Sequence, residues 1–174
     1  MKINALSFLG LTVLLSGFVA CKTLTQESPP PPIKTDKTEY KAVRNNTSKP
    51  AIELTIQTEY TNNTGKTVYL VGCEKPAAPT LQKYVDGRWI TAYEPVENQC
   101  LRRPWEIRNG QTYKDTYQVR GYIPGNNIAP TFDVPVPGKY RLVREIYSTW
   151  SDQPYTSQFL PMHQRVSNEF TITE

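Results

Sequence analysis

The sequence predicts an all-β protein whose main part, residues 50–174, is an antiparallel β-sandwich of about seven strands. Three observations predict this fold class. Tyrosine (11) and proline (15) are abundant among the 174 residues, and such a composition favours strands and turns over long helices. Several segments alternate apolar and polar residues with a period of two, and turn formers separate them. No segment shows the pattern of a convincing amphipathic helix.

The first predicted strand is the segment 52–60, Ile-Glu-Leu-Thr-Ile-Gln-Thr-Glu-Tyr. Its strict alternation is typical of a strand with one buried face. The turn formers Thr-Asn-Asn-Thr-Gly at 61–65 end it, and 67–71 is expected to form the next strand.

The strongest local signal is the pair Asp86-Gly87 between the segments 80–85 and 88–93. This pair favours a type I′ turn, because both of its central positions require positive φ angles. The two segments are therefore predicted to form a β-hairpin. Trp89 follows the turn, and we expect it to belong to the core.

Three further strands are predicted at 111–119, 139–147 and 168–173. Asn109-Gly110 precedes the first of them, and Gly138 precedes the second. Side chains expected to share a face are Tyr113, Tyr117 and Val119 in the first strand, and Phe170 and Ile172 in the last.

The N-terminal residues 1–20 have the pattern of a signal peptide. Lys2 is the single charge, and the apolar core 6–15 lies within the uncharged stretch 3–20. The stretch closes with Phe18-Val19-Ala20-Cys21. A small residue directly before a cysteine resembles the lipobox of bacterial lipoproteins, although Phe18 stands where that family usually has leucine.

The lipobox resemblance implies that the Cys21 thiol carries diacylglycerol, with palmitate-type acyl chains, and that the chain is cut just before this residue. Two other interpretations remain open. An ordinary signal peptide would release the protein after cleavage. An uncleaved anchor is also possible, because the 18 uncharged residues approach the length of about 20 that spans a membrane.

Residues 21–49 are predicted to be the lipidated cysteine and a flexible, disordered Pro-rich tether. The four prolines at 29–32 favour a polyproline II spacer about 12 Å long. The rest shows no apolar periodicity, so no burial would offset the entropy of ordering it. A flexible tether of this length would have an r.m.s. reach of about 30 Å. A docking site for a proline-binding partner is the alternative.

Three segments carry a second resemblance. They are 61–65 (TNNTG), 81–89 (LQKYVDGRW) and 136–143 (VPGKYRLV). Together they resemble bacterial immunoglobulin-like domains, which are frequent in envelope proteins, and the resemblance covers about residues 50–174. The intracellular proteinase inhibitor family of bacilli is a similar sandwich. Segments 72–79 and 94–104 fit the pattern poorly. These motifs are turns and core positions, so they imply an immunoglobulin-like fold and little about function.

The resemblance also assigns a structural role to Tyr140. In immunoglobulin-like sandwiches, a tyrosine near the start of the penultimate strand hydrogen-bonds to the backbone of the loop before it. Leu142 stands where antibody domains carry a cysteine, so the inter-sheet disulfide of antibodies is not expected.

Cys73 and Cys100 remain once Cys21 is lipidated, and we predict that they form a disulfide. Closing this loop should stabilise the fold by about 3–4 kcal/mol on the chain-entropy model. Two free thiols, or two ligands of a metal site, are the alternatives. The chain has one histidine, which makes a metal site a poor alternative.

No catalytic motif is recognisable in the sequence. His163 is the one histidine and is expected in a loop; there is no nucleophile elbow, phosphate loop or metal-ligand spacing. Glu53, Glu59, Asp115 and Glu145 are expected to face solvent. The net charge of +4 is spread between acidic residues, which argues against a nucleic-acid partner. We therefore predict a protein that is not an enzyme and has no cofactor.

The candidate binding surface consists of Trp105, Trp150, Tyr147 and Tyr155. Both tryptophans lie in polar, turn-rich surroundings, and the connection 148–167 lies at an end where sandwiches often place binding loops. These rings could stack on a sugar.

The expected function is a non-catalytic, membrane-anchored envelope lipoprotein. Its domain would be a binding or accessory module for an unknown envelope protein. A carbohydrate- or peptidoglycan-binding module and a protease-inhibitor-like domain are the alternatives. Lys22 is not the aspartate that retains lipoproteins at the inner membrane of enteric bacteria, so the outer membrane is expected where the cell has one.

Overall fold

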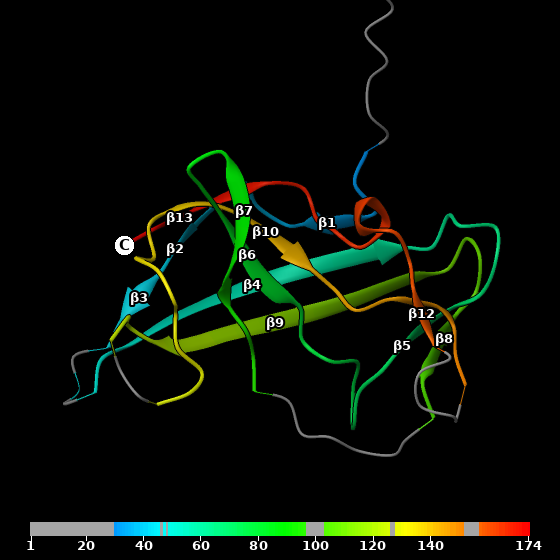
Figure 1. Cartoon of the computed structure of the whole chain (residues 1–174), viewed down its shortest axis with the longest axis horizontal. Helices are drawn as coiled ribbons and strands as arrows, with labels where there is room; N and C mark the ends of the chain where they lie inside the picture. Colours follow the sequence, from blue (N-terminus) through cyan, green and yellow to red (C-terminus); the bar gives the residue numbers. More distant parts are fainter. Residues whose placement is uncertain (1–29, 46, 48, 97–102, 126–127, 152–156) are drawn as a thin grey trace, which may run out of the picture.

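The computed structural model describes residues 30–45, 47, 49–96, 103–125, 128–151 and 157–174 (Figure 1). Their regular secondary structure is β-strand throughout, apart from one short 3-10 helix at Met162–Gln164. The strands are β1 (Ile33–Thr35), β2 (Glu39–Lys41), β3 (Val43–Arg44), β4 (Ala51–Thr61), β5 (Val68–Leu70), β6 (Thr80–Val85), β7 (Arg88–Tyr93), β8 (Trp105–Ile107), β9 (Thr112–Tyr122), β10 (Gly138–Val143), β11 (Tyr147–Thr149), β12 (Gln158–Phe159) and β13 (Phe170–Thr173). The predicted all-β fold is confirmed.

Two of the sheets pack face to face and enclose the main core. In the first sheet, β4 pairs with β9 on one side and with β1 and β3 on the other. The second sheet has the order β2-β13-β10-β6-β7, and its strands cross over the long β4–β9 pair (Figure 1). A third sheet, β12-β11-β5-β8, extends one end of the molecule.

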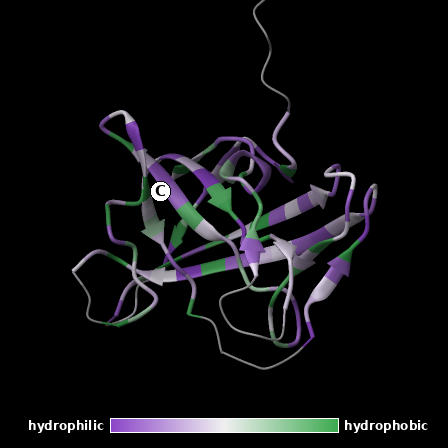
Figure 2. Ribbon diagram, turned by 45° about the vertical axis from the view of Figure 1, so that its right-hand side comes forward, coloured by the Kyte–Doolittle hydropathy of each residue, from purple (hydrophilic) through white to green (hydrophobic). Residues whose placement is uncertain are grey.

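The main core takes alternate residues from both facing sheets, which is why hydropathy alternates along the long strands (Figure 2). Ile52, Leu54 and Ile56 of β4 contribute from the first sheet, as predicted. Tyr140 and Leu142 of β10 contribute from the second. The predicted one-sided burial of 52–60 is therefore confirmed.

The connectivity is that of an immunoglobulin-like sandwich. β4 pairs with β9 in one sheet, while β6, β10 and β13 lie side by side in the other, with β7 added by a hairpin. The N-terminal strands divide between the sheets: β1 runs antiparallel to β4, and β2 runs parallel to β13. At the hairpin, Asp86 and Gly87 have φ angles of 48° and 82°, as the type I′ prediction requires.

The described residues form more strands than the seven predicted, because one predicted strand is interrupted and short strands form where none was predicted. The predicted strand 139–147 ends at Val143 and resumes as β11 at Tyr147. Between them, Arg144 and Ile146 remain buried, with 2% and 0% exposure.

The predicted boundary between tether and domain is wrong. Residues assigned to the tether form β1, β2 and β3, and Ile33, Tyr40 and Ala42 are at most 4% exposed. β1 and β2 bury one side chain each and β3 buries none, and all three take their hydrogen bonds from β4 or β13, so no periodicity marks them in the sequence. Among the described residues, the folded domain begins at Ile33 instead of residue 50. Residues 21–29 lie outside the described part of the chain.

A buried ion pair separates two hydrophobic clusters. Arg144 follows Leu142 of the main cluster and precedes Ile146 of a second cluster, which also contains Val68 and Leu70. Its Nη2 lies 3.0 Å from Asp115 Oδ2, and the two side chains are 3% and 10% exposed. Arg144 Nη1 also donates to the carbonyl of Ala77 (3.2 Å).

The prediction that Asp115 faces solvent is therefore wrong. Asp115 has the same parity on β9 as the buried Tyr117 and Val119, so its side chain points between the sheets. Glu53 and Glu145 are exposed as predicted, and Glu59 is half-buried.

The predicted asparagine turn is held by the fully buried side chain of Asn62. Its Nδ2 donates to the carbonyls of Lys66 and Ile107, both at 2.7 Å. Its Oδ1 accepts from the amide and hydroxyl of Thr64. This one side chain thus joins the β4–β5 turn to the end of β8.

The role predicted for Tyr140 is confirmed. Its hydroxyl donates to the carbonyl of Val136 at 2.5 Å, within the loop before β10. The ring is fully buried, and burial raises the pKa of the hydroxyl.

Alkaline pH is expected to destabilise the fold through its buried tyrosines. Burial raises the pKa of both Tyr40 and Tyr60 from 10 to about 12, and a hydrogen bond to Asp36 adds to the effect at Tyr40. Because the folded pKa exceeds the unfolded one, this stabilisation is complete below pH 10 and is lost as pH rises towards 12. Urea midpoints measured from pH 8 to 12 should fall across this window.

A Tyr60→Phe variant provides the control for this titration. It should show a shallower fall of the urea midpoint, because the unfolded chain then has one fewer group to ionise. An unchanged slope would contradict the assignment of the effect to Tyr60.

Candidate binding surface

The structure brings together part of the predicted binding surface. Tyr147 and Trp150 are in contact, with ring centres 5.7 Å apart and planes at 83°. Tyr155 lies outside the described residues. Trp105 belongs to another face of the molecule, as described below.

Tyr147 lies in a row of side chains that crosses the third sheet. It pairs with Phe159 of β12 on one side and with Tyr69 of β5 on the other, and Tyr69 pairs with Glu106 of β8. Paired residues in a sheet have side chains on the same face. This face points outward, because Val68 and Leu70, which flank Tyr69, are each 1% exposed.

The rings of this row mainly contact one another. Tyr147 stacks on Phe159 with centres 4.4 Å apart, and the Arg165 guanidinium carbon lies 4.7 Å from the Phe159 ring centre. Burial and the nearby Glu145 carboxylate raise the pKa of Tyr147, whose hydroxyl contacts Glu145 Oε2 at 3.3 Å. Sugar stacking needs a free ring face. Tyr147 and Phe159 therefore offer mainly edges to a ligand.

Sequence reasoning missed Phe159, Tyr69 and Arg165 as members of this cluster. Phe159 lies in the connection 148–167, but its pairing with Tyr147 depends on a register shift between Tyr147 and Thr149. No local pattern in the sequence indicates such a register shift.

Trp105 does not join this cluster. Trp105 lies on the same face of its strand as the buried Ile107, and it pairs with the buried Leu70. Its side chain therefore points to the opposite face from that of Glu106, which belongs to the outward-facing row. At the start of β8 its side chain is 44% exposed. The two tryptophans predicted to act together therefore belong to different faces.

The expectation that Trp89 belongs to the core is also wrong. Trp89 is half-buried and pairs with Tyr84, which is 42% exposed. Both residues alternate with inward-facing neighbours, so they lie on the outer face of the second sheet. The pairs next to the turn are in regular register, so the outward orientation of Trp89 follows from that of its partner Tyr84.

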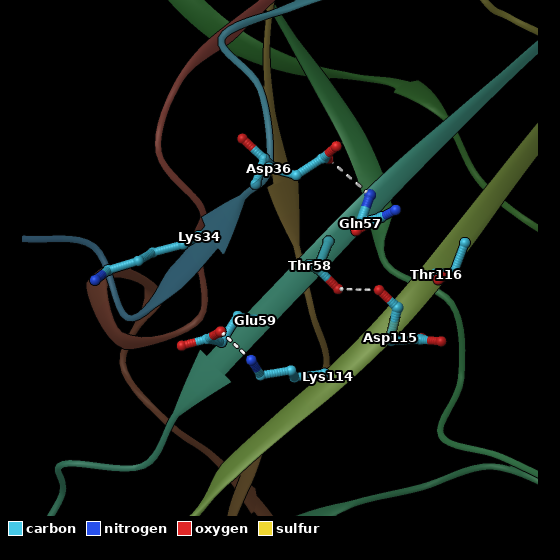
Figure 3. Close-up of a pocket in the computed structure, with 9 residues that line it drawn as sticks. Lys34, Asp36, Gln57, Thr58, Glu59, Lys114, Asp115 and Thr116 are labelled. Carbon is cyan, nitrogen blue, oxygen red and sulfur yellow. Dashed lines mark hydrogen bonds and ion pairs between the residues drawn. The ribbon is translucent and has the colours of Figure 1, made fainter.

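A polar cavity of about 420 Å³ lies beside β1, β4 and β9 (Figure 3). Most of its charged groups contact other groups of the protein: Lys114 Nζ lies 3.0 Å from Glu59 Oε2, and Asp36 Oδ1 accepts from the Gln57 backbone amide at 2.9 Å. Burial opposes ionisation of Asp36, but hydrogen bonds from Tyr40 and Gln57 outweigh it and lower the pKa. This arrangement suits a stabilising polar network better than an acid–base pair.

His163 lies in the 3-10 helix instead of the predicted loop, and its side chain is exposed. It lines a cavity of about 670 Å³ with the prolines 30–32 and Tyr60. Across the described ranges, no three histidine, cysteine, aspartate or glutamate side chains gather in a way that could hold a metal ion.

One cysteine of the predicted disulfide, Cys73, lies among the described residues. Cys73 is half-buried in the connection from β5 to β6 and is disulfide-bonded. Cys100 lies outside the described residues, as does Cys21, so the pairing of Cys73 with Cys100 stays a prediction.

Comparison with known proteins adds no relative: no family model matches the chain, and neither does any curated protein. Within the part of the chain that the structure describes, no helix has the length and apolar character needed to cross a membrane.

Proposed function

We propose that this chain is a non-catalytic envelope lipoprotein, held on a membrane outside the cytoplasm by lipid on Cys21. Its sandwich would bind a protein partner or serve as an accessory module. The observation that carries the proposal is the order of segments. An uncharged apolar run ends in Ala20-Cys21, and a folded domain begins at Ile33. Because Lys22 follows the cysteine, the outer membrane is the proposed location where the cell has one.

The corrected domain boundary makes the tether short. Eleven residues separate Cys21 from Ile33, and a fully extended chain from one to the other spans about 40 Å at most. A lipid on Cys21 would hold the domain within this distance of the membrane surface. Such a geometry suits a module that contacts other envelope components near the membrane.

Replacing Cys21 with serine tests the anchor. Each buried CH₂ contributes about 0.8 kcal/mol, so two or three acyl chains hold a protein on a membrane almost permanently. Wild-type chain should fractionate with membranes and incorporate radiolabelled palmitate, whereas Cys21→Ser should do neither. Cys73→Ser is the matched control and should stay on the membrane. Unchanged membrane retention of Cys21→Ser would overturn the lipoprotein assignment.

Exposed aromatic rings support a binding role. Trp105, Phe159 and Tyr84 are 44%, 46% and 42% exposed, and aromatic residues with arginine are enriched at protein interfaces. A carbohydrate ligand is less well supported at Tyr147 and Phe159, because their faces contact each other. That alternative now depends on Trp105, and protease inhibition depends on the family resemblance alone.

A further inference from the structure

The outer face of the second sheet carries a compact group of aromatic and basic side chains. Leu81, Tyr140 and Leu142 point into the core from β6 and β10, so the residues between them point outward. Arg141 of β10 pairs with Gln82 of β6, and Tyr84 of β6 pairs with Trp89 of β7. The group therefore spans three adjacent strands.

Arg141 is held in a fixed position at the centre of this group. Its Nε and Nη2 both donate to Gln82 Oε1, at 2.9 and 2.8 Å. Its guanidinium carbon lies 4.5 Å from the centre of the Trp89 ring, within the range of a cation–π contact. The side chain is thus ordered before any ligand arrives, which lowers the entropic cost of binding.

The positive charge of Arg141 is not neutralised by these contacts. Gln82 is neutral, and among the described residues no carboxylate lies within ion-pair distance of Arg141. The neighbouring Lys139 is different, because it forms an ion pair with Glu169. Because Nε and one N–H of Nη2 are directed at Gln82, the second N–H of Nη2 and both N–H groups of Nη1 are left for an incoming carboxylate.

The ring contacts favour a protein ligand over a sugar. Arg141 lies over the Trp89 ring, Lys139 Nζ lies 5.4 Å from the Tyr84 ring centre, and the two rings are 5.2 Å apart. One face of each ring is therefore covered by a cation. The exposed edges and the guanidinium suit a protein surface, where tryptophan, tyrosine and arginine dominate binding energy.

We propose that this outer face binds an acidic segment of a protein partner, with an aspartate or glutamate paired to Arg141 and apolar side chains against Trp89 and Tyr84. The inference deepens the proposed function, on which it rests, by naming the surface and the chemistry of the partner.

Site-specific photo-crosslinking of the full chain in intact source cells tests the proposal. A photoreactive amino acid replaces Thr91, which is exposed and pairs with Gln82 beside Arg141. The matched control position is Gln118, exposed on β9 of the other sheet. We expect a protein adduct from position 91, and the peptide crosslinked in the partner should contain aspartate or glutamate.

Substitutions then test the chemistry. Arg141→Gln should reduce the adduct about ten-fold or more, as for an interface hot spot. Tyr84→Ala should also reduce the adduct. Because Tyr84 is exposed, this variant keeps the test valid if Arg141→Gln does not fold. Arg120→Gln is the matched control, because Arg120 is a 71% exposed arginine on β9, and it should leave the adduct unchanged.

Each of the other possible results refutes a specific part of the proposals. An adduct at position 118 without one at 91 would leave the binding function standing and refute this face. Adducts at neither position would refute binding through this face and leave the lipid anchor to the Cys21→Ser test. An adduct to a polysaccharide, to a second copy of the chain or to a segment without acidic residues would refute the acidic protein partner.

Discussion

Arg144→Met is expected to lower the free energy of unfolding by about 3–5 kcal/mol, the usual effect of removing one partner from a buried ion pair. The substitution leaves the Asp115 carboxylate in a position that is 10% exposed, without the guanidinium that lies 3.0 Å away. It also removes the donor to the Ala77 carbonyl and the cation that lies 5.4 Å from the Tyr113 ring centre. Urea unfolding monitored by tryptophan fluorescence measures the change.

Two controls separate the ion pair from simple loss of packing. The double variant Arg144→Met/Asp115→Leu should recover much of the stability, because apolar residues often replace a buried pair without net cost. Arg120→Met breaks the exposed pair with Glu53, whose side chains are 71% and 47% exposed, and should cost less than about 1 kcal/mol. Equal losses at Arg120 and Arg144 would contradict the burial of the Arg144–Asp115 pair.

Loss of the predicted disulfide is expected to cost about 3–4 kcal/mol on the chain-entropy model. Cys73→Ser and Cys100→Ser should lower the urea midpoint by the same amount, and the double variant should lower it no further. Wild-type protein treated with reductant should match these variants. Equal effects are required because either substitution opens the same loop.

Peptide mapping of the unreduced protein checks the pairing directly. A single linked peptide pair containing Cys73 and Cys100 is the expected result. A linked pair that joins Cys73 to Cys21 would contradict both the disulfide prediction and the lipid anchor.

The parts of the fold that were predictable have a strong local signal. Segment 52–60 alternates strictly, and Asp86-Gly87 supplies the two positive φ angles that its hairpin needs. By contrast, β1 and β2 are three-residue strands, and their stability comes from partners far away in the sequence. Ile33 is the one buried residue of β1, and Tyr40 is the one buried residue of β2. A single buried position gives no hydrophobic periodicity to detect in the sequence.

The sequence predicted which types of residue form the candidate surfaces, but it did not predict how these residues are arranged. The sequence indicated which aromatic residues lie near turns, but the register decides which of them meet. Tyr147 meets Phe159 through a register shift, and Trp105 has the wrong parity to join them. Arg144 sits between Leu142 and Ile146 in an alternating stretch, yet its partner Asp115 lies 29 residues away. Such long-range pairs need the three-dimensional structure.

The parallel pairing of β2 with β13 joins Glu39 to Thr171, positions 132 residues apart in the sequence. During synthesis the early strand has no neighbour in its sheet until residue 171 has emerged. The sandwich therefore cannot close progressively from its N-terminus, and Tyr40 stays accessible to chaperones and proteases in the meantime.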